Sequence, residues 1–490
     1  MPLSARAALA TTALLAVPVL AHADPAYTAG NLLISSSIYN LPASTIVVGQ
    51  TVLPGGSGAT AVANASYPNV FQNEAPDPSF GITTPITISQ VTQSGAVVSS
   101  QVLSGITTSF PSKSEGGLSL SANGQSVTLM GYNAAPGVLD VSNSNTPGHP
   151  DSTNPVQQTY QRSIATISGT GAVTTQPVDS YSGNNGRNAI TGANGVTYTV
   201  GNAGNGTSKA TTAVLADQLA NTGVQIVAPG SANTTSAGAY NVTQNGYAAD
   251  KASKDPNFRG ITINDNTVYV TKGSGGNGIN TVYQVGTAGT LPTGSSNAIT
   301  ILPGFNTKLA ADPTANSYPF GLFFANTTLY VADEGLAGTV TSQAGLEKWS
   351  LVNGTWQEDY ILTAGLNLGT KYAVAGLDPS LDPATTGLRN LSGIVNADGT
   401  VSLFAVTATS SALTDQGADA NSVVAITDLV SAMTLPGSEA FTTIAAPTYA
   451  TVYRGVSQVP LAASTAVPEP ISLAVMGTGL LGMFSVRRRR

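Results

Sequence analysis

Cysteine is absent from the 490 residues of this chain, and histidine occurs only at His22 and His149. Without cysteine there is no disulfide framework, no thiolate zinc site and no thiol nucleophile, so packing has to stabilise the fold. Because His22 lies in an N-terminal leader, a Ser-His-Asp hydrolase centre has to be built around His149 or not at all.

Charge is also scarce. Only 9% of the residues are charged, whereas Gly, Ser, Thr and Asn occur along the whole length, which favours many short strands and turns over helices. Five of the 18 basic residues and one of the 25 acidic residues lie in the two terminal segments, so the body between them carries a net charge of about −11. An acidic body is unsuited to nucleic acids, because binding to them depends on basic residues that release counterions.

The N-terminus has the organisation of a secretory signal peptide, residues 1–23. Arg6 precedes an apolar stretch that is too short to span a bilayer, and Ala21 and Ala23 frame a small-x-small cleavage site before Asp24. The sequence therefore predicts an extracytoplasmic protein.

The C-terminus, residues 463–490, combines three ordered features. The stretch Val467-Pro468-Glu469-Pro470 precedes an uncharged segment, 471–486, which is followed by Arg487, Arg488, Arg489 and Arg490. Sixteen helical residues rise about 24 Å, a marginal span of the roughly 30 Å hydrocarbon core. Arginines at the end of such a helix stay in the cytoplasm, so the sequence predicts a membrane anchor with the body outside.

These three features resemble the PEP-CTERM sorting signal. The resemblance covers only some 24 residues and implies a substrate of an exosortase, in a Gram-negative bacterium that makes extracellular polysaccharide. The protein would be membrane-anchored, or found at the cell surface or secreted after sorting. The same module also appears under the label of an ice-binding protein C-terminal domain, and that label concerns the tail alone.

The body, residues 24–462, contains a repeated β-hairpin in which two alternating apolar stretches flank a turn rich in Asn, Asp and Gly. Successive hairpins start near residues 117, 188, 260, 321 and 393, so they are 61 to 72 residues apart. A second hairpin often follows within a unit, and four strands are the content of one propeller blade.

A sixth start, near Tyr453, leaves no room for three further strands before the anchor. Strands at residues 31–36, 85–91 and 97–102 supply them, and pairing the last strand with the first closes the ring. We therefore predict an all-β fold, a six-bladed β-propeller, with seven blades as the main alternative. A β-helix or a pair of sandwiches remains open.

Basic residues recur where the predicted inner strand of a unit begins. Arg187, Arg259 and Arg454 precede their strands in matching register, Arg389 and Lys113 stand a few residues further out, and Phe320 takes the place in the remaining unit. Such a ring predicts an anion-binding funnel at the channel mouth, because arginine suits carboxylate, sulfate or phosphate. In the alternative interpretation, each arginine bridges to an acid or carbonyl of a neighbouring blade.

Asp333 and Glu334 end a second strand and are candidates for oxygen ligands of Ca²⁺. A resemblance to lactonase-like six-bladed hydrolases implies an axial metal, but acids occur in one unit here, and a solvated loop explains them as well. No other cofactor is expected.

The sequence predicts a non-enzymatic, surface-retained propeller of the envelope or exopolysaccharide matrix that binds polysaccharide or another exported protein. The rival prediction is a secreted enzyme, a metal-dependent hydrolase or polysaccharide lyase acting at the channel mouth. In that enzyme Arg187, Arg259 and Arg454 would hold a substrate carboxylate.

Overall fold

The computed structural model describes residues 27–39, 46–63, 71, 81–109, 114–151, 154, 156–204, 212–336, 340–412 and 416–462. The predicted signal peptide, the predicted sorting segment with its anchor, and Lys113 lie outside these ranges. Within them, no helix is long and apolar enough to cross a membrane.

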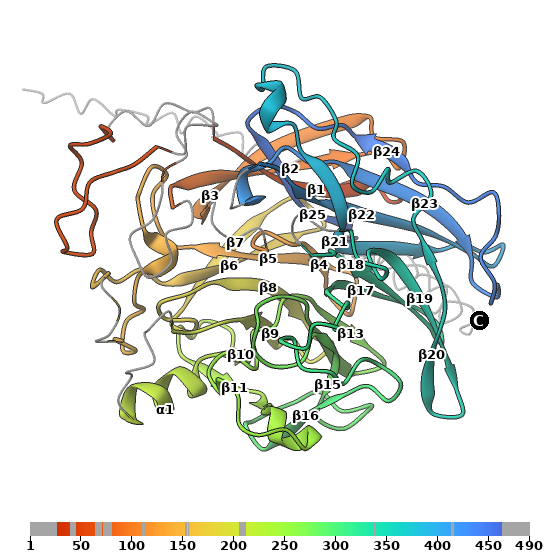
Figure 1. Ribbon diagram of the computed structural model, residues 1–490, viewed down its shortest axis with the longest axis horizontal. Helices are drawn as coiled ribbons and strands as arrows, with labels where there is room; N and C mark the ends of the chain where they lie inside the picture. Colours follow the sequence, from red (N-terminus) through yellow and green to blue (C-terminus); the bar gives the residue numbers. More distant parts are fainter. Residues whose placement is uncertain are drawn as a thin grey trace, which may run out of the picture.

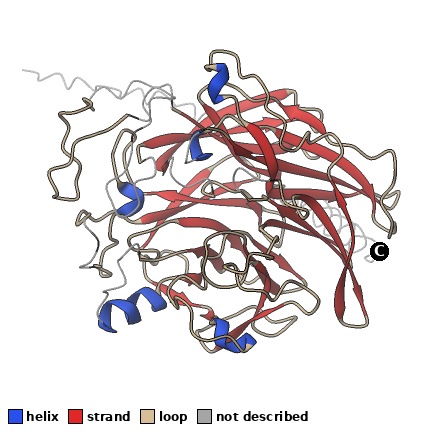
Figure 2. Ribbon diagram, in the orientation of Figure 1, coloured by secondary structure: helices blue, strands red, loops and turns tan. Residues whose placement is uncertain are grey.

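Strands dominate the described ranges, with only short helical segments between them (Figure 2). The all-β class predicted from composition is therefore confirmed. The helical segments are α1 (Thr212–Ala220) and four 3₁₀ helices, η1 (Val141–Asn143), η2 (Val242–Asn245), η3 (Pro379–Leu381) and η4 (Gln416–Ala418).

The largest sheet has eight strands and joins the two ends of the described chain. Its order is β25 (Thr451–Gln458), β1 (Leu32–Ile38), β2 (Thr83–Val91), β3 (Val97–Ser109), β5 (Ser126–Tyr132), β6 (Arg162–Ser168) and β7 (Val173–Val178), with β4 (Ser119–Leu120) paired to β5. A single residue pair, Thr107 with Tyr132, connects β3 to β5. The sheet therefore consists of two four-stranded groups, β25-β1-β2-β3 and β4-β5-β6-β7.

Four further sheets follow in chain order. The first contains β8 (Gly186–Thr191), β9 (Thr197–Gly201), β10 (Gly223–Val227) and β11 (Thr234–Ser236). The second contains β13 (Ile261–Asn264), β14 (Thr267–Lys272), β15 (Thr281–Val285) and β16 (Asn297–Ile301), and β12 (Gly238–Ala239) adds to its outer edge. The last two contain β17 (Pro319–Ala325), β18 (Thr328–Asp333), β19 (Gly345–Val352) and β20 (Thr355–Leu362), then β21 (Ala384–Val395), β22 (Thr400–Ser410), β23 (Val423–Leu429) and β24 (Thr442–Ala445).

The sheets are arranged around a common centre, as in a β-propeller (Figure 1). The inner strand of each group contacts the inner strands of its neighbours: β4 contacts β8 and β25, β13 contacts β8 and β17, and β21 contacts β17 and β25. These contacts form a closed circuit. Apolar clusters fill the space between neighbouring sheets, and one of them joins Leu346 of β19 to Leu403 of β22.

The predicted pairing of the last strand with the first is confirmed. β25 runs antiparallel to β1, from Leu32 opposite Gln458 to Ile38 opposite Thr451. Because this pairing joins the two ends of the described chain, backbone hydrogen bonds close the ring.

The hairpin turns follow from residue types that tolerate a positive φ angle. Asp265 and Asn266 connect β13 to β14 with φ of 46° and 54°, and Asn353 and Gly354 connect β19 to β20 with φ of 51° and 80°. Two successive left-handed residues give the turn whose twist matches that of paired strands. The Asn, Asp and Gly pattern in the sequence therefore located these hairpins correctly.

Candidate functional site

Several of the predicted ring residues lie at irregularities in the inner strands. Arg187 falls between the pairs Gly186–Gly201 and Asn188–Val200, so it has no partner opposite in β9. Arg454 in β25 and Phe320 in β17 occupy corresponding bulges. A β-bulge bends the strand and redirects a side chain, and bulges are common beside functional sites.

Arg389 corrects one detail of the sequence interpretation. It does not stand further out than the others, because it lies inside β21 at a register shift between Leu388 and Leu391. It directly precedes Asn390, as Arg187 directly precedes Asn188, so the two arginines occupy equivalent positions. The sequence placed Arg389 too far out because β21 begins at Ala384, earlier than the hairpin start near residue 393 indicated.

Two of the ring arginines meet at one serine. Ser114 Oγ accepts a hydrogen bond from Arg187 Nε at 3.1 Å and another from Arg259 Nη1 at 3.0 Å. Arg187 also donates to the Phe258 carbonyl at 3.2 Å, and Arg259 donates to Ser274 Oγ. Both side chains are buried, and neither forms a salt bridge within the described residues.

Lys272, at the end of β14, adds a third buried cation to this pair. Its ammonium group donates to the Ser274 carbonyl at 2.8 Å and to Asn280 Oδ1 at 3.1 Å. Burial, reinforced by the positive charge of Arg259, lowers the pKa of Lys272 to about 7. Burial and the same neighbour lower the pKa of Arg187 to about 9. Arg187, Arg259 and Lys272 are called the cation cluster below.

The other two ring arginines lie beside acids. Arg389 Nε donates to Glu334 Oε2 at 3.1 Å, and both side chains are buried. Arg454 donates to Ser37 Oγ at 2.8 Å and lies close enough to Glu115 to favour its ionised form. Ion pairing is therefore direct at Arg389, whereas in the cation cluster cations adjoin one another. Glu334 and Glu115 lie near enough to favour the charged forms of Arg259 and Arg187 respectively.

Glu115 is fully buried between the two groups of the largest sheet. It accepts hydrogen bonds from Thr108 Oγ1 and from the Ser109 amide, both at 3.0 Å, and from the Tyr132 hydroxyl. Burial raises the pKa of Glu115 to about 7, although these bonds and Arg454 oppose the shift. Glu115 therefore changes its charge close to neutral pH.

The predicted metal candidates have other partners in this structure. Asp333 accepts hydrogen bonds from the amides of Tyr318 at 2.5 Å and Gly335 at 2.8 Å, and it also adjoins the buried carboxyl of Glu347. Burial raises the pKa of Asp333 to about 7 and also raises that of Glu347, so the two carboxyls retain a proton between them. Within the described ranges, no group of three or more His, Asp or Glu residues is arranged to hold a metal. Ca²⁺ binding at Asp333 and Glu334 stays a prediction.

His149 has an acidic partner that the sequence did not indicate. Its Nδ1 lies 2.7 Å from Asp217 Oδ1, on α1, and both side chains are partly exposed. Asp151, its neighbour in sequence, accepts instead from Gln218 Nε2 at 2.7 Å. The nearby Ser182 hydroxyl donates to the His149 carbonyl, not to the ring. Among the described residues, no serine hydroxyl is hydrogen-bonded to the His149 ring.

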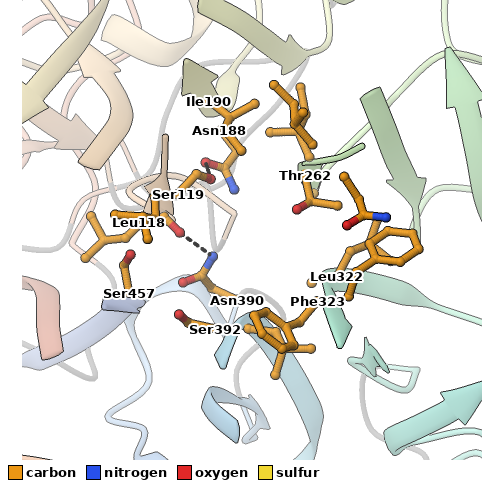
Figure 3. A pocket seen from close by; sticks show the side chains of 18 of the residues that line it. Leu118, Ser119, Asn188, Ile190, Thr262, Leu322, Phe323, Asn390, Ser392 and Ser457 are labelled. Carbon is orange, nitrogen blue, oxygen red and sulfur yellow. Dashed lines mark hydrogen bonds between the residues drawn. The ribbon is translucent and has the colours of Figure 1, made fainter. Parts of the chain in front are cut away.

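A cavity of about 210 Å³ lies among the inner strands, next to the ring residues (Figure 3). It is lined by segments of β4, β8, β13, β17, β21 and β25, and none of its lining residues is ionisable. Asn188 and Asn390, which follow ring arginines, both contribute to its wall. The centre of the molecule therefore combines a charged region with an uncharged hollow.

Sequence reasoning located Arg187, Arg259, Arg389 and Arg454, but it missed Ser114, Glu115 and Lys272. Lys272 had a signal, since it ends the second strand of its hairpin as Asp333 does in a later unit. Ser114 and Glu115 had none, because they precede a strand of only two residues, β4.

Comparison with known proteins gives one sequence match and several weak structural ones. Residues 466–490 match the PEP-CTERM protein-sorting motif, which confirms the resemblance seen in the tail. No curated protein sequence matches the chain.

The haemagglutinin-neuraminidase ectodomain of parainfluenza virus 5 is 11% identical, with 70% of this chain and 75% of that chain covered and a TM-score of 0.35. The acylaminoacyl peptidase of Pyrococcus horikoshii is 8% identical, covers 76% and 44%, and has a TM-score of 0.30. A quinonprotein alcohol dehydrogenase-like protein of Bacteroides thetaiotaomicron is 10% identical, covers 76% and 85%, and has a TM-score of 0.27. Similarities this low carry no argument about activity or ligand.

Proposed function

We propose that this chain, which carries a PEP-CTERM sorting motif at residues 466–490, is an exported and surface-retained six-bladed β-propeller that binds an acidic polysaccharide without cleaving it. The motif implies export, recognition by an exosortase and sorting to the envelope of a Gram-negative bacterium. In this proposal residues 1–23 direct export, and residues 463–490 form the anchor on which the exosortase acts.

Six blades follow if the two halves of the eight-stranded sheet are counted separately. The reason for separating them is that β3 and β5 share one residue pair, whereas neighbouring strands within each half share several. The circuit of contacts among the inner strands β4, β8, β13, β17, β21 and β25 supports the same count.

The observation that carries the ligand assignment is the pair of buried arginines that share one neutral oxygen. Arg187 and Arg259 meet at Ser114 Oγ, and Lys272 lies beside them. Buried cations are unfavourable unless anions compensate them, and a carboxylate or sulfate oxygen would be a better acceptor than a hydroxyl. An acidic sugar unit supplies such a group, and an envelope rich in polysaccharide supplies the polymer.

The test is binding of oligogalacturonate to the purified protein, measured by isothermal titration calorimetry, with neutral dextran oligomers for comparison. We expect oligogalacturonate to bind and the Arg187→Met and Arg259→Met variants to bind it at least about tenfold more weakly, because each loses a charge-assisted hydrogen bond. Lys371→Met removes an exposed charge and serves as the matched control.

Equal affinity in the arginine variants and the control would refute the assignment to the cation cluster. Absence of any binding to oligogalacturonate and to a sulfated oligomer such as heparin would refute an acidic ligand. Chain cleavage during the titration, detected as new reducing or unsaturated ends and abolished by EDTA, would instead identify the metal-dependent enzyme.

A further inference from the structure

The cavity among the inner strands differs chemically from the cation cluster, although the two adjoin. Its volume of about 210 Å³ equals the liquid volume of roughly seven water molecules. Its wall contains amide and hydroxyl groups between aliphatic and aromatic side chains, among them Leu118, Leu322 and Phe323. Figure 3 shows these side chains surrounding an open centre.

Two asparagines of the wall are held in defined orientations. Asn390 donates through Nδ2 to the Leu118 carbonyl at 3.2 Å and accepts through Oδ1 from the Val456 amide at 2.7 Å. Asn188 accepts through Oδ1 from Ser119 Oγ at 3.0 Å and from the Ala189 amide at 2.9 Å. These two bonds fix the side-chain oxygen of Asn188. Its amide nitrogen makes no hydrogen bond within the described residues.

Three polar groups of the wall make no hydrogen bond within the described residues: Asn188 Nδ2, Thr262 Oγ1 and Ser392 Oγ. They come from three inner strands, β8, β13 and β21, and thus from different sides of the cavity. Asn188 is buried and Thr262 and Ser392 are half-buried, so partners for these groups would lie inside the cavity. Ordered water or the hydroxyls of a ligand provide them.

Gly117 lies close to the amide groups of both asparagines. A Cβ atom at this position would lie 3.2 Å from Asn188 Nδ2 and 3.4 Å from Asn390 Nδ2. The missing side chain therefore lets both amides approach one point.

We propose that this cavity is a binding site for one uncharged, hydroxyl-rich ring of the size of a pyranose, and that Asn188, Thr262 and Ser392 bind its hydroxyls. The lack of ionisable groups in the wall disfavours a charged ligand, because a buried charge would have no partner there. The aliphatic and aromatic side chains suit the apolar faces of a sugar ring, and a few fixed polar groups are typical of small-ligand sites. The proposal does not depend on the cation cluster.

The test is saturation-transfer NMR and calorimetry of the purified protein with d-glucose, d-galactose and d-mannose, with cyclohexanol as an apolar ring of similar shape. We expect at least one of the sugars to bind and cyclohexanol to bind more weakly. Asn188→Ala should weaken sugar binding at least about tenfold, because it removes a donor and leaves a ligand hydroxyl unpaired. Asn233→Ala changes an exposed asparagine and is the matched control.

Ser392→Ala is a milder second variant that serves if Asn188→Ala does not fold, and it should also weaken the binding of the sugars. Oligogalacturonate is titrated into the same variants, so failure here is distinguished from failure of the proposed function. The proposal is overturned if no neutral sugar binds, which would identify a water-filled channel. It is equally overturned if both cavity variants bind the sugars as the control does.

Discussion

Arg162 is wholly buried at the start of β6 and is bonded to the backbone of the surrounding loops. Its Nε donates to the Asn184 carbonyl at 2.8 Å, Nη1 donates to those of Ser144 at 3.0 Å and Tyr160 at 2.9 Å, and Nη2 donates to that of Ser142 at 2.9 Å. Burial lowers the pKa of Arg162 to about 10, so it still carries its charge at neutral pH. One side chain thus donates hydrogen bonds to several loop carbonyls that lie outside the hydrogen-bonded strands.

Replacing Arg162 with methionine should therefore destabilise the fold by on the order of 3 kcal/mol, because several buried carbonyls lose their donor at once. The free energy of unfolding in urea measures this, with Lys371→Met as a control for loss of an exposed charge. A loss below about 1 kcal/mol would mean that water replaces the guanidinium without cost.

At the residue scale, the sequence picked out the recurring arginines, and its alternative interpretation named the kind of partner that two of them have: Glu334 for Arg389 and the Phe258 carbonyl for Arg187. The arginines were found because they recur at strand starts, and a one-dimensional repeat preserves that signal. Whether Arg389 pairs with an acid or Arg187 with a neutral serine depends on residues from other parts of the chain. Glu334 lies 55 residues from Arg389 in the sequence, and Ser114 lies 73 residues from Arg187. The sequence alone does not indicate such partners.

At the scale of the element, prediction succeeded where local chemistry decides the structure. The hairpins β13–β14 and β19–β20 follow from turn residues and alternating side chains. The bulges at Arg187 and Arg454 were not predicted, because a bulge is a property of two paired strands. The short outer strands, such as β11 and β24, lack a strong apolar pattern and were also missed.

A buried ionic network joins two neighbouring sheets. Lys348 of β19 donates to Asp428 Oδ2 of β23 at 2.8 Å, and both side chains are fully buried. The Tyr360 hydroxyl donates to Asp428 Oδ1 at 2.6 Å, and the Tyr330 hydroxyl donates to the same carboxylate. The network therefore fixes β23 against β18, β19 and β20.

Lys348→Met should cost about 3 to 5 kcal/mol, because it leaves the Asp428 carboxylate buried without a cation. The double variant Lys348→Met with Asp428→Leu should recover part of this loss, since it removes both charges and the cost of burying them. Chemical denaturation of the two variants and the wild type measures the difference, with Lys308→Met at the surface as the control. A double variant less stable than the single one would contradict this account.

At the scale of the whole molecule, the chain has to hold a ring of sheets together without disulfides. The pairing of β25 with β1 closes that ring, and it was predictable because the sixth hairpin start lacked strands that the N-terminus could supply. The body also contains several carboxyl groups that the ring and the sheets bury. Their protonation couples the stability of the whole fold to pH.

Burial raises the pKa values of Glu115 and Asp333 to about 7 each, and partial burial beside Asp428 raises that of Glu439 to about 7, far above the usual carboxyl range. Between about pH 4 and pH 7 these groups keep their protons in the folded chain and lose them in the unfolded chain. The unfolded state then binds fewer protons, so the free energy of unfolding falls as the pH rises through this window. The melting temperature should accordingly be several degrees higher at about pH 5 than at about pH 7.

Differential scanning calorimetry across this window measures the slope, and Glu115→Gln should reduce it, because the amide mimics the protonated acid at every pH. Asp398→Asn is the control: hydrogen bonds from Thr400 lower the pKa of the exposed Asp398, so its contribution is lost only in more acidic solution. A melting temperature that stays constant or rises from pH 5 to pH 7 would show that these carboxyls are ionised in the folded protein. The buried network around Glu115 would then have to contain a compensating cation, and Arg454, whose charge favours the ionised form of Glu115, is a candidate on the ring.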